Sequence, residues 1–301
     1  MPRDLDQLPG RLLLDGGMGT SLIGRGLEVG KQPTEGWNVS RPNEVKAVHE
    51  AFIRAGSRAI QTNTFGANRY RLHQFGHGHD VRRFNVEGVM AARAVAGSEV
   101  LVIGSLGPTG AIPPPEGDAS LLELEYAFAE QAAALADGGV DLLHVETLYH
   151  PKEARASVRG CRAGAPDLPV VASMSCSVVG ESFRTTMGFP AESMIAAIVE
   201  EGANGIGANC TLVPADMLDL VRLLVEKSGL PVFAKPTVAP NGGAPLYPDE
   251  FATGVTALFA VGARAVGGCC GAGAADIAAA SAGMDSAPTS IPPASTRPYG
   301  A

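Results

Sequence analysis

Three cysteines in the C-terminal third of the chain have the types and spacing best suited to chemistry. Cys269 and Cys270 are adjacent, follow an apolar run and are flanked by glycines, and Cys210 closes a similar run. If both runs are strands of one sheet, the three thiols meet at one edge. Thiolate is the metal-binding form of cysteine, and three protein ligands with one open position are typical of catalytic zinc. We therefore predict that Cys210, Cys269 and Cys270 bind Zn²⁺, rather than serving only as small buried hydrophobic residues.

A zinc ion held by three thiolates favours one kind of reaction. A free thiol has a pKa of about 8.5, so only a few per cent of a thiol substrate is thiolate at neutral pH. Binding at the open position removes the proton, and the surrounding negative charge keeps the added sulfur electron-rich. Such a site activates a sulfur for attack on an electrophilic carbon, for example a methyl group.

The cysteines depend for their placement on a regular alternation of strands and helices. Segments with helical periodicity separate eight short apolar runs, which cover residues 11–15, 59–63, 100–106, 141–146, 169–176, 205–210, 231–236 and 265–270. Runs this apolar are typical of strands buried on both faces, as in a parallel sheet. Eight strand–helix units predict an α/β fold, a single (β/α)8 TIM barrel over residues 1–286.

An open, doubly wound sheet is the alternative fold. Such a sheet binds a dinucleotide through a Gly-x-Gly-x-x-Gly turn after its first strand. Residues 15–20, Asp-Gly-Gly-Met-Gly-Thr, are rich in glycine but lack the third glycine at that spacing. The barrel is therefore the favoured interpretation.

Polar residues at the ends of the predicted strands complete the candidate site, because the active site of a TIM barrel lies at these ends. They are Asp15, Thr62, Ser105 and Glu146. We expect Asp15 and Glu146 to receive the ammonium group of an amino-acid thiol. The backbone of Gly16 and the side chain of Thr62 are expected to donate hydrogen bonds to its carboxylate. Glu146 as part of a salt bridge inside the barrel, and Asp15 as a cap of the following turn, remain open.

Composition limits the partners and the compartment. The 301 residues carry a net charge of −8 and contain no basic run, which argues against a nucleic-acid surface. No apolar run reaches about 18 residues, and the N-terminus lacks the apolar region of a signal peptide, so no membrane partner is expected. The five cysteines indicate a reducing compartment, and we predict a cytoplasmic protein. Residues 287–301 are rich in proline and serine and are predicted to form a disordered tail.

Other histidines and cysteines are weaker candidates. His73, His77 and His79 have spacings that a metal could use, but a polar loop explains them better. Cys161 lies in a predicted helix between two arginines, and we expect no function for it. Cys176 ends the fifth predicted strand and is not expected to be a ligand.

Six sequence blocks resemble the signature blocks of the zinc-dependent homocysteine S-methyltransferase family. In chain order they are residues 15–20, 61–68, 104–110, 146–147, 207–210 and 267–271. The blocks at 63–68 and 104–110 look most like the homocysteine-binding barrel of cobalamin-dependent methionine synthase. The resemblance implies a TIM barrel that binds zinc through the three cysteines and methylates homocysteine to methionine. It also implies that Asp15, Thr62 and Glu146 hold the amino and carboxylate groups of homocysteine.

The resemblance leaves the methyl donor open. Members of the family use methylcobalamin, betaine, S-methylmethionine or S-adenosylmethionine, and we expect a methylated corrinoid supplied by a separate protein or a small onium compound. Relatives carry Pro-Asn after the seventh strand, where this chain has Pro236-Thr237, so the resting coordination of the metal is open as well. A non-catalytic zinc- and thiol-binding subunit is the alternative function. A zinc hydrolase would need a basic residue beside the metal, and no histidine ends a predicted strand.

Overall fold

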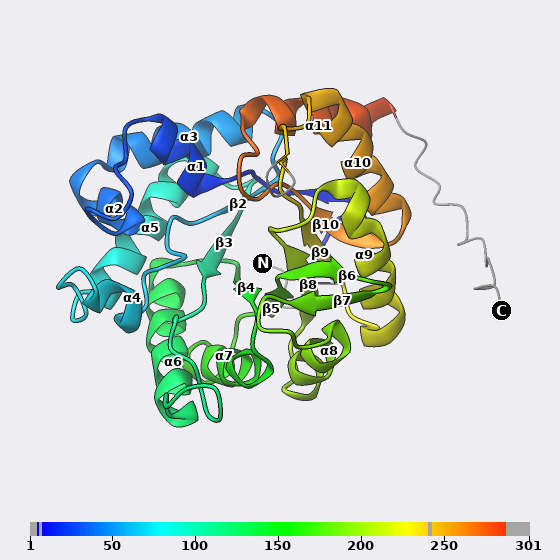
Figure 1. The fold of residues 1–301 in the computed structure, drawn as a ribbon. Coiled ribbons are helices and arrows are strands. Elements are labelled where there is room, and N and C mark those ends of the chain that lie inside the picture. Colours follow the sequence, from blue (N-terminus) through cyan, green and yellow to red (C-terminus); the bar gives the residue numbers. More distant parts are fainter. Residues whose placement is uncertain (1–4, 6–7, 240–242, 287–301) are drawn as a thin grey trace.

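The computed structural model describes residues 5, 8–239 and 243–286, and a ring of parallel strands lies at its centre (Figure 1). Neighbouring strands of the eight-stranded sheet follow the order β1-β10-β9-β8-β5-β4-β3-β2. The strands of this sheet are β1 (Leu12–Leu13), β2 (Ala59–Gln61), β3 (Leu101–Leu106), β4 (Leu142–Leu148), β5 (Val170–Met174), β8 (Gly205–Asn209), β9 (Val232–Lys235) and β10 (Ala263–Val266). Each lies within or overlaps one of the eight predicted runs, and the predicted TIM-barrel architecture is confirmed.

The ring is nearly closed, and β1 and β2 meet at its one seam. The amide of Arg58 donates to the carbonyl of Leu13 at 2.9 Å. Further along, the amide of Gln61 donates to the side-chain carboxylate of Asp15 at 2.7 Å. A carboxylate therefore takes the place of a strand carbonyl at the end of the barrel where the strands terminate.

Helices surround the strands on all sides in Figure 1. They are α1 (Met18–Gly24), η2 (Thr34–Gly36), α2 (Trp37–Ser40), α3 (Pro42–Arg54), α4 (Arg69–His73), α5 (Val81–Ala96), α6 (Leu121–Gly138), α7 (Pro151–Gly164), α8 (Ala191–Glu200), α9 (Pro214–Ser228), α10 (Pro248–Ala260) and α11 (Ala274–Ser286). Four of these helices begin at a proline, whose fixed φ suits a first helical turn and whose missing N–H is not needed there. None of the helices in the described part of the chain is both long and apolar enough to cross a membrane.

Alternating side chains give the barrel an apolar interior below a polar layer. One hydrophobic cluster contains a residue from each of several strands, including Ala59, Ile103, Leu142, Val171 and Phe233. Two positions further along the same strands are polar residues, namely Gln61, Ser105, His144, Ser173 and Lys235. Because side chains two apart on a strand point to the same face, these polar groups lie directly above the apolar core. The candidate site is built on this layer.

Glycines on β8 leave room for the polar layer. A Cβ on Gly207 would lie 2.2 Å from the hydroxyl of Ser173 and 2.4 Å from the carbonyl of Phe233. No real side chain tolerates such distances, so β8 approaches its neighbours closely because it has no side chain at this position. The hydroxyl of Ser173 is thereby free to contact the Nε2 atom of His144 at 2.6 Å.

A short hairpin that the sequence did not reveal follows β5. It consists of β6 (Cys176–Val179) and β7 (Ser182–Thr185), which pair antiparallel in a sheet of their own. Our fifth run extended to residue 176, but β5 ends at Met174 and Cys176 opens the hairpin. The predicted tail at 287–301 lies outside the described residues.

Candidate metal and thiol site

The sulfur atoms of Cys210, Cys269 and Cys270 form a compact cluster, as the sequence predicted. All three lie within 4.8 Å of one another, and those of Cys210 and Cys270 are 3.5 Å apart. Zinc–sulfur bonds of about 2.3 Å in a tetrahedral site imply sulfur–sulfur distances of about 3.8 Å. The three thiols therefore fit one zinc ion. Within the described residues, no other group of three His, Cys, Asp or Glu side chains has a comparable arrangement.

The end of β9 holds two of the cysteines in place from the backbone. The amide of Cys210 donates to the carbonyl of Lys235 at 2.9 Å, and the amide of Cys269 donates to the carbonyl of Pro236 at 2.8 Å. Cys210 has a φ of +63°, an uncommon conformation for a residue with a side chain. The two thiols therefore converge from both sides of β9, although they are far apart in the sequence.

Close packing of two glycine-rich loops positions Cys269. A Cβ on Gly17 would lie 2.5 Å from the carbonyl of Cys269, and a Cβ on Gly16 would lie 2.3 Å from the carbonyl of Ala272. The amide of Gly17 uses this closeness to donate to Ala272 at 2.9 Å. The glycines after β1 thus fix the loop that carries the cysteine pair.

The thiols of the cluster interact with one another, whereas Cys161 and Cys176 are buried apart from them. Hydrogen bonds from Cys269 and Cys270 lower the pKa of Cys210 to about 3, while their hydrogen bonds with Cys210, together with burial, raise the pKa values of Cys269 and Cys270. Burial raises the pKa of Cys176 to about 12, and burial likewise raises the pKa of Cys161. Neither Cys161 nor Cys176 belongs to the cluster of three sulfurs, so their exclusion as ligands rests on their position.

A cavity of about 270 Å³ lies against the cysteine cluster. The predicted site residues Gly16, Thr62, Ser105 and Glu146 line it together with the three cysteines. Further lining residues come from the loop after β1 and from the strand ends, and they include Thr34, Glu35, Gln61, Asn63, Phe65, Thr147 and Lys235. One cavity therefore brings together every predicted site residue except Asp15.

Hydrogen bonds connect the polar residues on the β2–β4 side of the cavity. The Oε1 atom of Glu146 accepts from the hydroxyl of Ser105 at 2.6 Å and from the side-chain amide of Gln61 at 2.9 Å. The hydroxyl of Thr62 accepts from the amide of Ser105 at 3.1 Å and contacts the hydroxyl of Thr64 at 2.6 Å. These bonds fix the Glu146 carboxylate with one oxygen engaged.

Asp15 lies below the cavity wall and is fully buried. Its Oδ1 atom is 2.9 Å from the ammonium nitrogen of Lys235, which also donates to the Oε1 atom of Gln61. Burial raises the pKa of Asp15, and the Lys235 ammonium opposes that rise. Asp15 thus has a cationic partner within the chain, which the sequence did not indicate, and its direct contact with a substrate ammonium stays a prediction.

Asn209 is a second residue that we did not single out. Its side chain donates to the hydroxyl of Thr147 and accepts from the amide of Thr147, both at 2.7 Å, and its Nδ2 atom is 3.8 Å from the sulfur of Cys269. Thr147 follows Glu146 directly and has a φ of +65°. Asn209 therefore links the substrate side of the cavity to the metal side.

Glu35 is a third residue that sequence reasoning missed. It lines the cavity, and its Oε1 atom accepts from the amide of Gly66 at 2.6 Å. A Cβ on Gly66 would lie 3.0 Å from that oxygen, so the glycine allows the close approach. Burial raises the pKa of Glu35 above its ordinary value. In the sequence, Glu35 lies between Pro33 and Trp37, and no local pattern predicts that its side chain points into the cavity.

Thr237 directly follows Pro236 after β9, at the position where the family resemblance led us to expect asparagine. Its hydroxyl donates to the carbonyl of Cys270 at 2.8 Å, and its amide donates to the carbonyl of Leu212. Thr237 therefore supports the loop that carries the cysteine pair and does not line the cavity.

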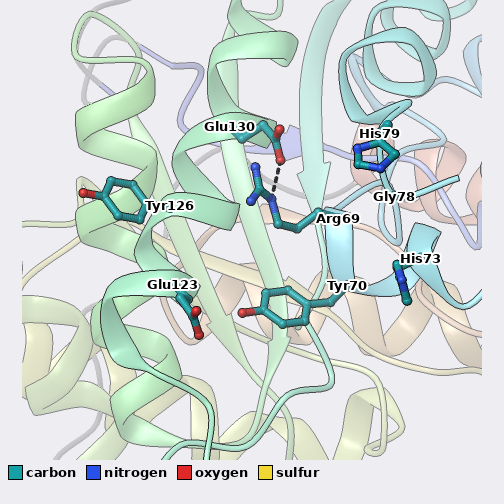
Figure 2. A pocket seen from close by; sticks show the side chains of 8 residues that line it. All are labelled: Arg69, Tyr70, His73, Gly78, His79, Glu123, Tyr126 and Glu130. Atoms are coloured by element: carbon teal, nitrogen blue, oxygen red, sulfur yellow. Dashed lines mark hydrogen bonds and ion pairs between the residues drawn. The ribbon is translucent and has the colours of Figure 1, made fainter.

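A second hollow, of about 530 Å³, lies outside the barrel between α4 and α6 (Figure 2). Arg69 crosses it to Glu130 at 2.9 Å, and two tyrosines and two histidines, His73 and His79, line its sides. His77 pairs with Asp80 at 3.0 Å. The histidines of this region thus face the surface and lie in a helix and a loop, separate from the cysteine cavity.

Comparison with known proteins identifies the family. The family described as "Homocysteine S-methyltransferase" matches residues 12–284 of the chain. The chain belongs to the homocysteine S-methyltransferase family. The resemblance seen in the six sequence blocks is confirmed, and the chain is an enzyme of this family.

Two family relatives are methionine synthases of mycobacteria. The protein from Mycobacterium tuberculosis (strain ATCC 25618 / H37Rv) is 32% identical over 297 residues, and that from Mycobacterium leprae (strain TN) is 31% identical over 297 residues. Each alignment covers 89% of this chain and 24% of the relative. The chain therefore spans about a quarter of the length of these curated relatives.

A solved structure of similar size shares the fold. The metallated form of the homocysteine methyltransferase MmuM from Escherichia coli has a TM-score of 0.77 and 25% sequence identity. The likeness covers 92% of this chain and 97% of that one. The barrel and its size are thus common to a family member that was solved with metal.

Proposed function

We propose that this chain methylates the thiol sulfur of homocysteine to give methionine, with zinc held by Cys210, Cys269 and Cys270. The observation that carries the proposal is the cluster of three sulfurs within 4.8 Å at the wall of a cavity. A bound zinc ion would act as a Lewis acid and lower the pKa of a thiol ligand, so that the thiol is ionised at neutral pH. The family match and the metallated relative support this assignment.

The residues opposite the cysteines bind the amino-acid end of homocysteine. The Oε1 atom of Glu146 is already engaged by Ser105 and Gln61, and within the described residues Oε2 has no hydrogen-bond donor, so it is the oxygen for the substrate ammonium. The backbone of Gly16 lines the same cavity and serves the carboxylate, while Thr62, whose hydroxyl donates to Thr64, shapes this side of the wall. Fixing this end aims the sulfur at the three thiolates.

Methyl transfer follows from this placement by simple displacement. The thiol proton leaves to solvent, the sulfur forms a bond to the methyl carbon, and the bond between that carbon and the donor breaks. The donor keeps the electron pair of the broken bond. Orientation is the main contribution of the chain, because a sulfur held in line with the donor needs little further reorganisation.

The donor is a methylated corrinoid on a separate protein or a small onium compound. The sequence blocks at residues 63–68 and 104–110 favour the corrinoid. The buried Glu35 and the ring of Phe65 on the cavity wall would favour a cationic onium compound, since carboxylates and aromatic rings both attract cations. We place the reaction in the cytoplasm, where five free cysteines remain reduced.

One assay tests the function. Zinc-loaded protein is incubated with homocysteine and, separately, with S-methylmethionine, S-adenosylmethionine, betaine or methylcobalamin, and methionine is measured by mass spectrometry. We expect methionine with one donor class, and none from a Cys270→Ala variant. If the protein binds zinc and homocysteine but forms no methionine with any donor, it is a non-catalytic thiol-binding barrel.

A further inference from the structure

Lys235 is a buried cation that faces the substrate cavity. It ends β9, is 4% exposed, and lines the cavity beside Glu146 and Cys269. The preceding residue on the same face of β9 is Phe233, which belongs to the apolar barrel interior, so Lys235 belongs to the polar layer above it. A lysine in this place is costly unless its charge is paired.

Asp15 provides the pairing. The ammonium nitrogen of Lys235 is 2.9 Å from Oδ1 of Asp15 and also donates to the side chain of Gln61. The position at Asp15 that a substrate ammonium would take is therefore occupied by an ammonium of the chain itself.

One N–H bond of the Lys235 ammonium group remains for a bound ligand. An ammonium group has three N–H bonds, and within the described residues two of them have acceptors, Asp15 and Gln61. Lys235 contributes to the cavity wall, so its third N–H is available to a bound anion. On the same wall, Glu146 has a carboxylate oxygen available to a bound cation.

We propose that Lys235 is a specificity-determining residue whose third N–H binds the carboxylate of the amino-acid thiol, while Glu146 binds its ammonium. The inference rests on the proposed function for the identity of the substrate as an amino-acid thiol. A cation and an anion side by side match the two charged ends of a zwitterion. Asp15 then acts through Lys235, by neutralising and orienting it, and does not touch the substrate.

Thiol binding to the cobalt-loaded protein tests this role without any methyl donor, because sulfur coordination changes the charge-transfer absorption of Co²⁺. The ligands are homocysteine and 3-aminopropane-1-thiol, which is homocysteine without its carboxylate. A charge-assisted hydrogen bond favours homocysteine by roughly 10- to 100-fold. Equal affinity of the wild-type protein for the two thiols would overturn the proposal before any variant is made.

The matched variant replaces both members of the pair, Asp15→Asn with Lys235→Met, so that no unpaired charge is left buried. We expect its preference for homocysteine to fall to about threefold or less, with the affinity for the aminothiol within about threefold of wild type. A purely structural role would weaken both thiols by the same factor and keep the preference, which would refute the proposal. Cobalt content per chain is measured for each protein to confirm an intact cysteine cluster.

A reciprocal variant serves as the control. Glu146→Gln is tested with 4-sulfanylbutanoate, which is homocysteine without its ammonium, and should lose the preference for homocysteine over this acid while keeping the preference over the aminothiol. Loss of both preferences in Glu146→Gln would contradict separate roles for the two residues. The binding ratios do not depend on turnover. A failure to form methionine would therefore count against the proposed function, whereas the role of Lys235 is decided by the binding ratios alone.

Discussion

Asn209 and Thr147 are joined by two hydrogen bonds of 2.7 Å, across a gap of 62 residues in sequence. The pair holds Thr147 at a positive φ directly after Glu146, a conformation that costs on the order of 1–3 kcal/mol. Because Asn209 immediately precedes Cys210, the same amide side chain connects a substrate residue to a metal ligand. The geometry of the cavity therefore depends on a residue that performs no chemistry.

Replacing Asn209 with alanine should damage stability and thiol binding together. The part-buried amide and hydroxyl of Thr147 lose their partners, which costs about 1 kcal/mol or more of the free energy of unfolding, and Glu146 loses its fixed orientation. Urea denaturation and homocysteine affinity measure the two effects. Asn85→Ala is the control, because the buried Asn85 side chain also makes hydrogen bonds, to Ala67, Val81 and Gln131, but none of these partners lines the cavity. A similar loss of homocysteine affinity in both variants would contradict this account.

Removing one ligand of the cluster should remove the metal. We expect Cys269→Ala to bind zinc more weakly by on the order of 100-fold or more, because two thiols and a solvent position make a poor zinc site. Metal content after dialysis against a mild chelator is the measurement. Cys161→Ala is the matched control, since Cys161 is a buried free cysteine in α7 and should leave the zinc content unchanged.

A single methyl group on Gly17 should disturb the metal site from a distance. The added Cβ would lie 2.5 Å from the carbonyl of Cys269, so the loop with the cysteine pair must move. We expect zinc affinity to fall by roughly 10- to 100-fold, as for other residues that orient ligands. Gly24→Ala has open space around its Cβ and lies in α1, so it should leave zinc affinity unchanged and stabilise the helix by about 0.5–1 kcal/mol. Equal zinc affinity in the two variants would show that the loop accommodates the methyl group.

His49 in α3 should make the protein sensitive to acid. It is fully buried, neither ring nitrogen has a partner within the described residues, and burial lowers its pKa to about 3. Between pH 3 and about 6.5 the unfolded chain binds a proton at this residue that the folded chain does not, so stability falls as the pH falls through that window.

His49→Leu should therefore stabilise the protein and flatten part of the acid dependence. Removing two unsatisfied nitrogens is worth about 1–3 kcal/mol at pH 7, and the gain over wild type should grow as the pH falls to 5. Chemical denaturation at pH 5, 6 and 7 measures this trend. His79→Leu at the exposed surface should change stability by less than about 0.5 kcal/mol. A gain for His49→Leu that is constant with pH would refute the assignment.

Much of the fold could be predicted from apolar runs, because each strand of a parallel barrel is buried on both faces. The cysteine cluster followed from the strand ends at Cys210 and Cys269. The hairpin β6–β7 was missed because its residues after Cys176 are partly exposed and carry no long apolar run. Lys235 was missed for another reason: its partner Asp15 is 220 residues away, and no local pattern records such a pairing.

The Asp15 carboxylate has a consequence for motion in the barrel. It accepts the amide of Gln61 at the seam between β1 and β2, and it anchors Lys235 on the cavity wall. A ligand that draws the lysine toward itself therefore also alters the hydrogen bond in which the Asp15 carboxylate takes the place of a strand carbonyl. The exchange rate of the Gln61 amide proton with solvent deuterium should then change when a ligand occupies the cavity. Hydrogen exchange at the seam between β1 and β2 would therefore report the bound state.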